Sequence, residues 1–126
     1  PIMAAAGADW RPLEKLDSKA KKSTSDTWSL KLVKNPDIIA SIKNDSLIKV
    51  GFAAESEDLI ENSKVKIKSK NLDFIVANDI TAKDSGFSVD TNKVTIIHSN
   101  GNIESLPLMS KYDVAHSILD RVKSGF

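Results

Sequence analysis

Short apolar segments along the chain alternate with polar ones in lengths typical of strands and the connections between them. Residues 28–34 (WSLKLVK) alternate apolar and polar side chains, which predicts a half-buried strand. Residues 72–77 (LDFIVA) are almost continuously apolar, as in a strand covered on both faces. Further strands are predicted at residues 47–54 (LIKVGFAA) and at residues 1–6 (PIMAAA), the latter as the end of a buried strand.

A short helix is predicted to follow the strand at residues 28–34. Asn35 is a favourable N-cap residue, and Pro36 suits the first helical position. Asp37 then lies beside the positive end of the helix dipole. The apolar residues that fit its buried face are Ile38, Ile39 and Ile42.

Residues 57–70 give two conflicting signals. Every second residue from Lys64 to Lys70 is a lysine, and this alternation taken alone predicts a strand. We predict a helix instead, capped by Ser56, because the next strand begins at Leu72 and several residues share one helical face. That face comprises Leu59, Ile60, Ser63 and Ile67.

The C-terminal part of the chain predicts a long loop, a hairpin and a helix. The loop covers residues 78–90, and the hairpin joins residues 93–98 to residues 103–108 through the turn pair Asn100-Gly101.

The last helix has the clearest end signals. Ser110 and Asp113 form a capping box, Met109 and Val114 a hydrophobic staple, and Gly125 ends the helix. Its predicted apolar stripe consists of Val114, Ala115, Ile118, Leu119 and Val122.

Strands that alternate with helices predict one α/β domain over residues 1–126. We expect a Rossmann-like open sheet, mostly parallel, with helices on both faces and a C-terminal hairpin plus helix. Ligands of such sheets bind outside the carboxyl ends of strands. This places the candidate site in residues 5–11, 52–55 and 77–79.

Composition excludes several classes of chemistry. The 126 residues include no cysteine, which excludes disulfides and thiol catalysis, and a reducing cytoplasm fits this. A net charge of +1 gives no strong field toward nucleic acid or membrane, so we expect neither as a partner. No apolar run approaches membrane-span length, and no phosphate-binding glycine motif is present. The two histidines, His98 and His116, are too few for most zinc sites and are expected at the surface or an edge.

Several charged residues each allow a plain and a functional interpretation. The lysines of residues 19–22 (KAKK) are either solvated loop charge or phosphate contacts. Lys66 and Lys70 are four apart, so a helix places both on one face, where they repel unless an acid or anion lies between them. From spacing alone, a solvated basic face is the better explanation. Asp9 either holds Mg²⁺ beside phosphates or pairs with Arg11 in a loop.

Two further candidates are equally open. Phe52, after Gly51, either stacks on a base or belongs to the core, and core is the usual place for a lone Phe. Asn78 and Asp79 either line a site or cap the backbone of the following loop, which is the common role of such residues.

Seven segments occur in a specific order along the chain: AAAGADWRP, KAKK, LVKNPDI, VGFAAE, KIKSK, LDFIVAND and DTNKVTII. Together they resemble the phosphopantothenate–cysteine ligases, which in many bacteria are the second half of a bifunctional coenzyme A biosynthesis flavoprotein. The resemblance covers essentially the whole chain. It implies that CTP activates 4′-phosphopantothenate as an acyl-cytidylate, which the amine of L-cysteine then attacks. It further implies Mg²⁺ as a cofactor, a homodimer, and FMN only where a decarboxylase domain is fused.

The resemblance also implies which residues lie near CTP. Asp9 is expected to hold the metal as well, and Lys19 to act in catalysis. The complete expected set is Met3, Ala4, Ala5, Asp9, Lys19, Pro36, Asp37, Ile38, Ile39, Phe52, Lys66 and Lys70.

The chain departs from the family pattern in a few places. Gly7 stands where a larger apolar residue is usual, and Ala20 where Ile is common. The family's opening βα portion would precede Pro1, so we expect a C-terminal portion of the ligase domain, completed by a separate or fused segment. Alone, this portion is expected to be inactive. A non-catalytic nucleotide-binding or regulatory module is the alternative.

Overall fold

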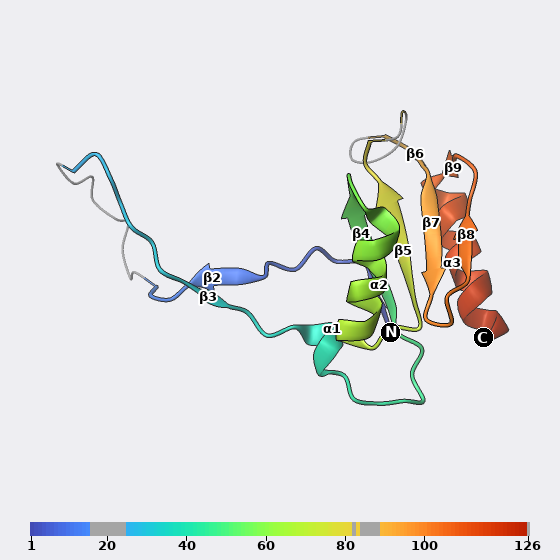
Figure 1. Cartoon of the computed structure of the whole chain (residues 1–126), viewed down its shortest axis with the longest axis horizontal. Helices are drawn as coiled ribbons and strands as arrows, with labels where there is room; N and C mark the ends of the chain where they lie inside the picture. The colour runs from blue at the N-terminus through green and yellow to red at the C-terminus, as the bar shows by residue number, and fades with distance from the viewer. Residues whose placement is uncertain (16–24, 82, 84–88, 126) are drawn as a thin grey trace.

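The computed structural model describes residues 1–15, 25–81, 83 and 89–125. Its centre is a five-stranded sheet in the order β1-β4-β5-β7-β8 (Figure 1). The strands are Ile2–Met3, Val50–Glu55, Phe74–Asp79, Val94–His98 and Ile103–Ser105. β1, β4 and β5 are parallel, whereas β7 runs against β5 and against β8. All strands of this sheet except β7 therefore run in one direction, which confirms the expected mostly parallel sheet.

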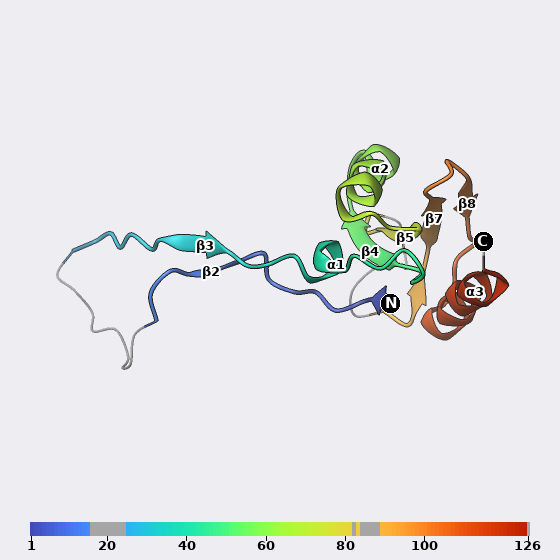
Figure 2. The same cartoon turned by 90° about the horizontal axis from the view of Figure 1, so that it is seen from below.

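Helices cover both faces of the sheet, as the α/β pattern predicts. The long helix α2 (Leu59–Lys70) and the single turn α1 (Ile38–Ser41) pack on one face. Helix α3 (Lys111–Ser124) packs on the other, as the view from below shows (Figure 2). Within the described ranges, no helix combines the length and the apolar composition needed to span a bilayer.

Strand β5 is buried on both of its faces. Ile75 and Ala77 point into the cluster beneath α2, and Phe74 and Val76 into the cluster beneath α3. All four are at most 2% exposed. The continuous apolar run at residues 72–77 therefore predicted the environment correctly, although the strand itself begins and ends two residues later.

The described residues between β1 and α1 form an arm that projects away from the sheet (Figure 1). β2 (Trp10–Pro12) pairs with β3 (Leu32–Lys34) in an antiparallel two-stranded ribbon. The strand predicted at residues 28–34 thus forms only at Leu32–Lys34. Its predicted half-buried environment is wrong for Leu30 and Leu32, which are 54% and 50% exposed. The buried strand end predicted at residues 1–6 is also wrong, because β1 is short and lies at the edge of the sheet.

Both predicted N-caps before α1 and α2 differ from the structure. Asp37, not Asn35, caps α1, because its side chain accepts a hydrogen bond from the Ala40 amide at 3.1 Å. Ser56 does not cap α2, because the turn after β4 extends to Asp58, which has a left-handed backbone and no side-chain cap bond. The choice of helix over strand for the lysine-rich segment is confirmed.

The hairpin and the last helix form as predicted. β7 and β8 are joined through a turn that contains Gly101. Its φ of +94° is a backbone conformation that residues with a Cβ rarely adopt, so the turn favours glycine. Ser110 Oγ accepts a hydrogen bond from the Asp113 amide, and Gly125 ends α3 with a φ of +69°. Ala115 and Leu119 are exposed, which corrects the predicted stripe: the buried face of α3 follows Val114 and Ile118. Two short strands, β6 (Thr91–Asn92) and β9 (Met109–Ser110), pair antiparallel where α3 begins.

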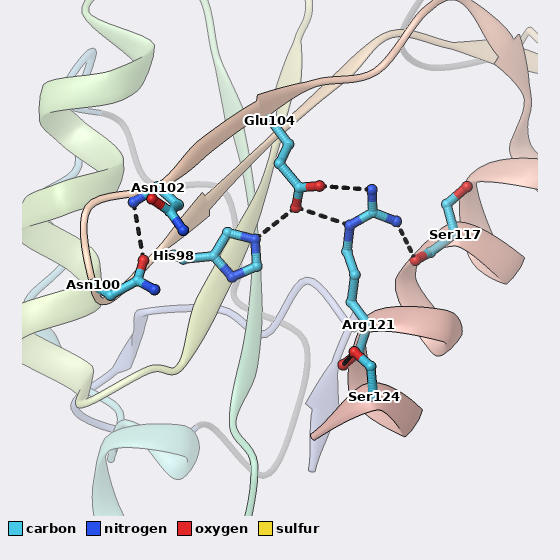
Figure 3. Close-up of polar contacts among 7 residues, drawn as sticks. All are labelled: His98, Asn100, Asn102, Glu104, Ser117, Arg121 and Ser124. Carbon is cyan, nitrogen blue, oxygen red and sulfur yellow. Dashed lines mark hydrogen bonds and ion pairs between the residues drawn. The ribbon is translucent and has the colours of Figure 1, made fainter. Parts of the chain in front are cut away.

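A polar cluster ties the hairpin to α3 (Figure 3). Arg121 donates to both carboxylate oxygens of Glu104, at 2.9 and 3.0 Å, and His98 Nε2 lies 2.6 Å from Glu104 Oε2. The side chain of His98 is only 10% exposed and its ring packs on Phe74, so the expected surface or edge position is wrong for this histidine. His116 is exposed on α3, as expected.

We expect Glu104→Gln to lower the free energy of unfolding at neutral pH and to make it fall less steeply as the pH becomes acidic. Hydrogen bonds from Arg121 and, secondly, from His98 lower the pKa of Glu104 from 4.5 to about 2. A lowered pKa in the folded state means that ionised Glu104 stabilises the protein above pH 4.5, and that this contribution is lost as pH falls toward 2. Because the carboxylate is 40% exposed, solvent screening reduces the contribution to about 1 kcal/mol.

Urea unfolding at pH 6 and pH 3 measures this difference. Wild type and the variant should differ by about 1 kcal/mol at the higher pH and by less at the lower. Glu61→Gln is the matched control, because Glu61 pairs with Lys64 at the surface and is 75% exposed. An equal loss at both pH values would contradict the assigned role of Glu104.

Candidate functional site

A cavity of about 580 Å³ lies on the α2 face of the sheet, beside the edge strand β1. One wall is the segment after β1, residues 5–9, which begins the arm. A second wall is residues 35–39, which lead into α1, and the third consists of two lysines of α2. Together with Gly51 and Phe52 of β4, these walls bring together four parts of the chain that are distant in sequence.

The floor of the cavity depends on a glycine. Gly51 lies in β4, and Leu72 and Ile75 complete the apolar floor around it. A Cβ at position 51 would lie 2.7 Å from Leu72 Cδ1, closer than such contacts allow. Leu72 is 4% exposed and cannot easily move away. The glycine thus lets the floor pack tightly while the space above β4 remains open.

Asn35 fixes the junction between the arm and the α1 wall. Its side-chain amide donates to the Ala8 carbonyl at 2.8 Å, and its Oδ1 accepts from Arg11 at 2.9 Å. Its backbone amide donates to the carbonyl of Asp9. Arg11 therefore pairs with Asn35 and with the Lys34 carbonyl, and the alternative pairing with Asp9 is not present.

Each of the two cavity lysines has a carboxylate partner. Lys66 Nζ lies 2.5 Å from Glu55 Oε1, and Lys70 Nζ lies 3.1 Å from Asp37 Oδ2. Two like charges one helical turn apart repel, and these carboxylates offset that repulsion. The Ala40 amide and, after it, Lys70 lower the pKa of Asp37, so this carboxylate is ionised at neutral pH. An anion that enters the cavity can thus meet two lysine ammonium groups that are already held in place.

The cavity gathers ten of the twelve residues that the family resemblance placed near CTP. Ala4 does not line it, and Lys19 lies outside the described residues. Phe52 is among the lining residues and is 41% exposed, so it is not a core residue. The ten are Met3, Ala5, Asp9, Pro36, Asp37, Ile38, Ile39, Phe52, Lys66 and Lys70.

Some lining residues were missed, and one predicted segment lies elsewhere. Asn35 and Gly51 were not predicted as site residues. Glu55 belongs to the predicted segment 52–55, but it does not line the cavity and instead pairs with Lys66; the spacing of Lys66 and Lys70 did indicate that an acid was needed near them. Residues 77–79 do not line the cavity. Asp79 instead caps the following turn by accepting from the amide and hydroxyl of Thr81, as one interpretation of this segment proposed.

A metal would have few protein ligands here. Among the described residues, no three His, Cys, Asp or Glu side chains group closely enough to hold an ion. Asp9 lines the cavity with a carboxylate, whereas both oxygens of Asp37 already accept hydrogen bonds or pair with Lys70. A single carboxylate suits an ion that keeps waters and substrate phosphates as its other ligands, which is the usual coordination of Mg²⁺.

The sequence profile of one protein family matches the chain over residues 1–126: the DNA/pantothenate metabolism flavoprotein C-terminal domain. The chain belongs to this family. The resemblance derived from the seven ordered motifs is thereby confirmed.

Curated relatives in this family include two bacterial proteins named "Coenzyme A biosynthesis bifunctional protein CoaBC". The one from Bacillus subtilis is 42% identical over 123 residues, which are 96% of this chain and 30% of the relative. The one from Borreliella burgdorferi is 46% identical over 122 residues, or 94% of this chain and 30% of the relative. The chain thus spans less than a third of the length of these relatives.

Solved structures of the family share the fold. The crystal structure of the C-terminal domain of a CoaBC protein superposes with a TM-score of 0.72 at 30% identity, over 98% of this chain and 52% of that one. The DNA/pantothenate metabolism flavoprotein from Streptococcus pneumoniae gives a TM-score of 0.66 at 22% identity, over 83% of this chain and 45% of that one. The Rossmann-like fold class expected for the family is confirmed.

Proposed function

We propose that this chain forms the nucleotide-binding part of a CTP-dependent phosphopantothenate–cysteine ligase in coenzyme A biosynthesis. The observation that carries this proposal is the cavity, which ten residues expected near CTP line together. Relatives named for coenzyme A biosynthesis, similar over nearly the whole chain, support the same conclusion.

The reaction has two steps in this proposal. An oxygen of the 4′-phosphopantothenate carboxylate attacks the α-phosphorus of CTP, and the bond to the bridging oxygen breaks, releasing pyrophosphate. The amine of L-cysteine then attacks the acyl carbon of the resulting acyl-cytidylate, CMP leaves with the bonding electron pair, and the ammonium loses a proton to solvent. Neither step needs a protein nucleophile, so catalysis rests on charge stabilisation and positioning.

The chain's own residues would supply cations and apolar contacts. Lys66 and Lys70 bind the triphosphate, and Phe52 provides a flat apolar surface for the base. Lys19 acts on the departing pyrophosphate, as its place in the family's K-x-K-K loop implies. Asp9 would hold Mg²⁺, which offsets negative charge on the triphosphate when bound.

The complete enzyme needs more than this chain in our proposal. An N-terminal segment, fused or separate, completes the ligase site, and FMN is required only where a decarboxylase domain is fused. We also propose a homodimer, because the arm exposes large apolar side chains that a second copy could cover. Sedimentation of the full-length protein measures this association. The exposed arm residues are Trp10, Leu13, Trp28, Leu30 and Leu32.

The nucleotide preference tests the proposed function. Calorimetry on the full-length protein, with and without Mg²⁺, should show CTP binding at least roughly tenfold more tightly than ATP, because a pocket matched to a pyrimidine excludes the larger purine. Chelation of Mg²⁺ should weaken CTP binding, since the triphosphate then meets the Asp9 carboxylate without its counterion. ATP binding as tight as CTP would contradict the proposal. CTP binding without pyrophosphate release on adding 4′-phosphopantothenate would favour the non-catalytic module.

A further inference from the structure

Lys49 is a buried lysine that takes no part in the cavity lining. It directly precedes β4 and is only 3% exposed. A buried ammonium group is costly unless hydrogen bonds satisfy it. Its Nζ donates to the carbonyls of Ile39 and Ile42, both at 3.2 Å. These carbonyls belong to the C-terminal end of α1, so the ammonium caps that helix.

Helix α1 needs such external support. It is a single turn of four residues, Ile38–Ser41, and a helix this short is not stable by itself. Its N-terminal end is satisfied by the Asp37 carboxylate, and the Ile38 carbonyl accepts from the Ser41 hydroxyl at 2.6 Å. The Ile39 and Ile42 carbonyls accept their hydrogen bonds from Lys49.

Lys49 is itself fixed to the sheet. Its backbone amide donates to Asp73 Oδ2 at 2.6 Å, and its carbonyl accepts from the Asp73 amide at 2.9 Å. Asp73 directly precedes β5. The side chain of Lys49 therefore connects the rigid start of β4 and β5 to a turn that the sheet does not pair with directly.

We propose that Lys49 is a positioning residue of the candidate nucleotide site, holding α1 so that residues 36–39 form the cavity wall. The inference rests on the proposed function only for the identity of the ligand, CTP. Pro36, Asp37, Ile38 and Ile39 line the cavity, and none of them is fixed by a β-ladder. Asp37 also holds Lys70, so movement of α1 would displace the cation with the wall.

Lys49→Met removes the ammonium but keeps an unbranched apolar stem in the same space. We expect the Ala40 and Ser41 amides, which donate to Asp37, to exchange their hydrogens roughly tenfold faster or more in the variant, while amides of β5 are unchanged. The dissociation constant for CTP should also rise, in proportion to the inverse of the fraction of molecules in which α1 is in place. Lys49→Gln retains a side-chain hydrogen-bond donor and should change the exchange rates and the CTP dissociation constant less. The same two measurements on Lys49→Gln test the inference if Lys49→Met does not fold.

Two control variants test whether the effect of Lys49→Met comes from loss of a positive charge or from loss of overall stability. Lys43→Met removes an exposed lysine near α1, and Val114→Ala weakens the core on the opposite face of the sheet. Neither should alter exchange at Ala40 or the CTP dissociation constant. Unchanged exchange in Lys49→Met, or a CTP loss no larger than in Val114→Ala, would overturn the inference. If wild type does not bind CTP, the proposed function fails while the exchange measurement still decides the role of Lys49.

Discussion

The Phe74→Ala variant is expected to lose about 3–5 kcal/mol of unfolding free energy. Phe74 begins β5, the strand at the middle of the sheet, and is 0% exposed. Its ring packs in the α3 cluster and lies 5.5 Å from the ring of His98. Alanine would leave a cavity that the flanking strands cannot fill, because their backbones are fixed by ladders on both sides. Urea unfolding followed by circular dichroism measures the loss.

Phe52→Ala is the matched control on the neighbouring strand. Phe52 is 41% exposed and is a lining residue of the cavity, so its removal should cost less than about 1 kcal/mol of stability while weakening nucleotide binding. A loss for Phe74→Ala below about 2 kcal/mol would mean that the core relaxes around the missing ring. The packing described for β5 would then be wrong.

Lys66→Gln is expected to weaken CTP binding by about 1–3 kcal/mol, the usual loss for a charge-assisted hydrogen bond. The structure places this loss near the upper end. Glu55 is 14% exposed and would remain as an unpaired carboxylate near the triphosphate once Lys66 is removed. Equilibrium calorimetry with the full-length protein measures the affinity, and single-turnover pyrophosphate release measures the chemical step.

Two further lysines give this prediction its contrast. Lys68→Gln removes an exposed charge from the same helix and should leave affinity and rate unchanged. Lys19→Gln should slow pyrophosphate release more than it weakens binding, because a contact made only in the transition state affects the rate. Equal losses of rate and affinity for Lys19→Gln would make it a ground-state contact. If Lys66→Gln binds CTP and reacts as wild type does, Lys66 is a solvated surface charge with no role in binding.

The parts of the fold that the sequence predicted well have strong local signals. The run of buried residues in β5, the Asn100-Gly101 turn and the Ser110 cap each depend on neighbouring positions. The start of α1 was missed because Asn35 and Asp37 are both good caps, and a tertiary contact decides between them. Asn35 is occupied by Ala8 and Arg11 from the arm, which leaves Asp37 to cap the helix.

The candidate site was predicted by family resemblance more than by residue pattern. Spacing placed Lys66 and Lys70 on one face but could not show which acids pair with them, because Glu55 and Asp37 approach only through the fold. The position of Phe52 was likewise undetermined, since both faces of β4 contact core clusters, through Val50 and Ala53, and the sequence does not show where that cover ends. The arm was misinterpreted because alternation describes a free ribbon and a half-buried strand equally well.

The order of the strands has a consequence for how the molecule folds. β7 and β8 meet across a short turn and then pack on the helix that directly follows, so their half of the sheet can form from contacts close in sequence. β1 pairs with β4, with Ile2 opposite Val50, so a long connection separates the two strands in sequence. The entropy cost of closing this long loop must be met before the pairing stabilises the sheet. The cavity is bounded by β1, the arm and α1. We therefore expect these walls to form later than the β7–β8–α3 half and to open more readily, so that ligand entry leaves that half undisturbed.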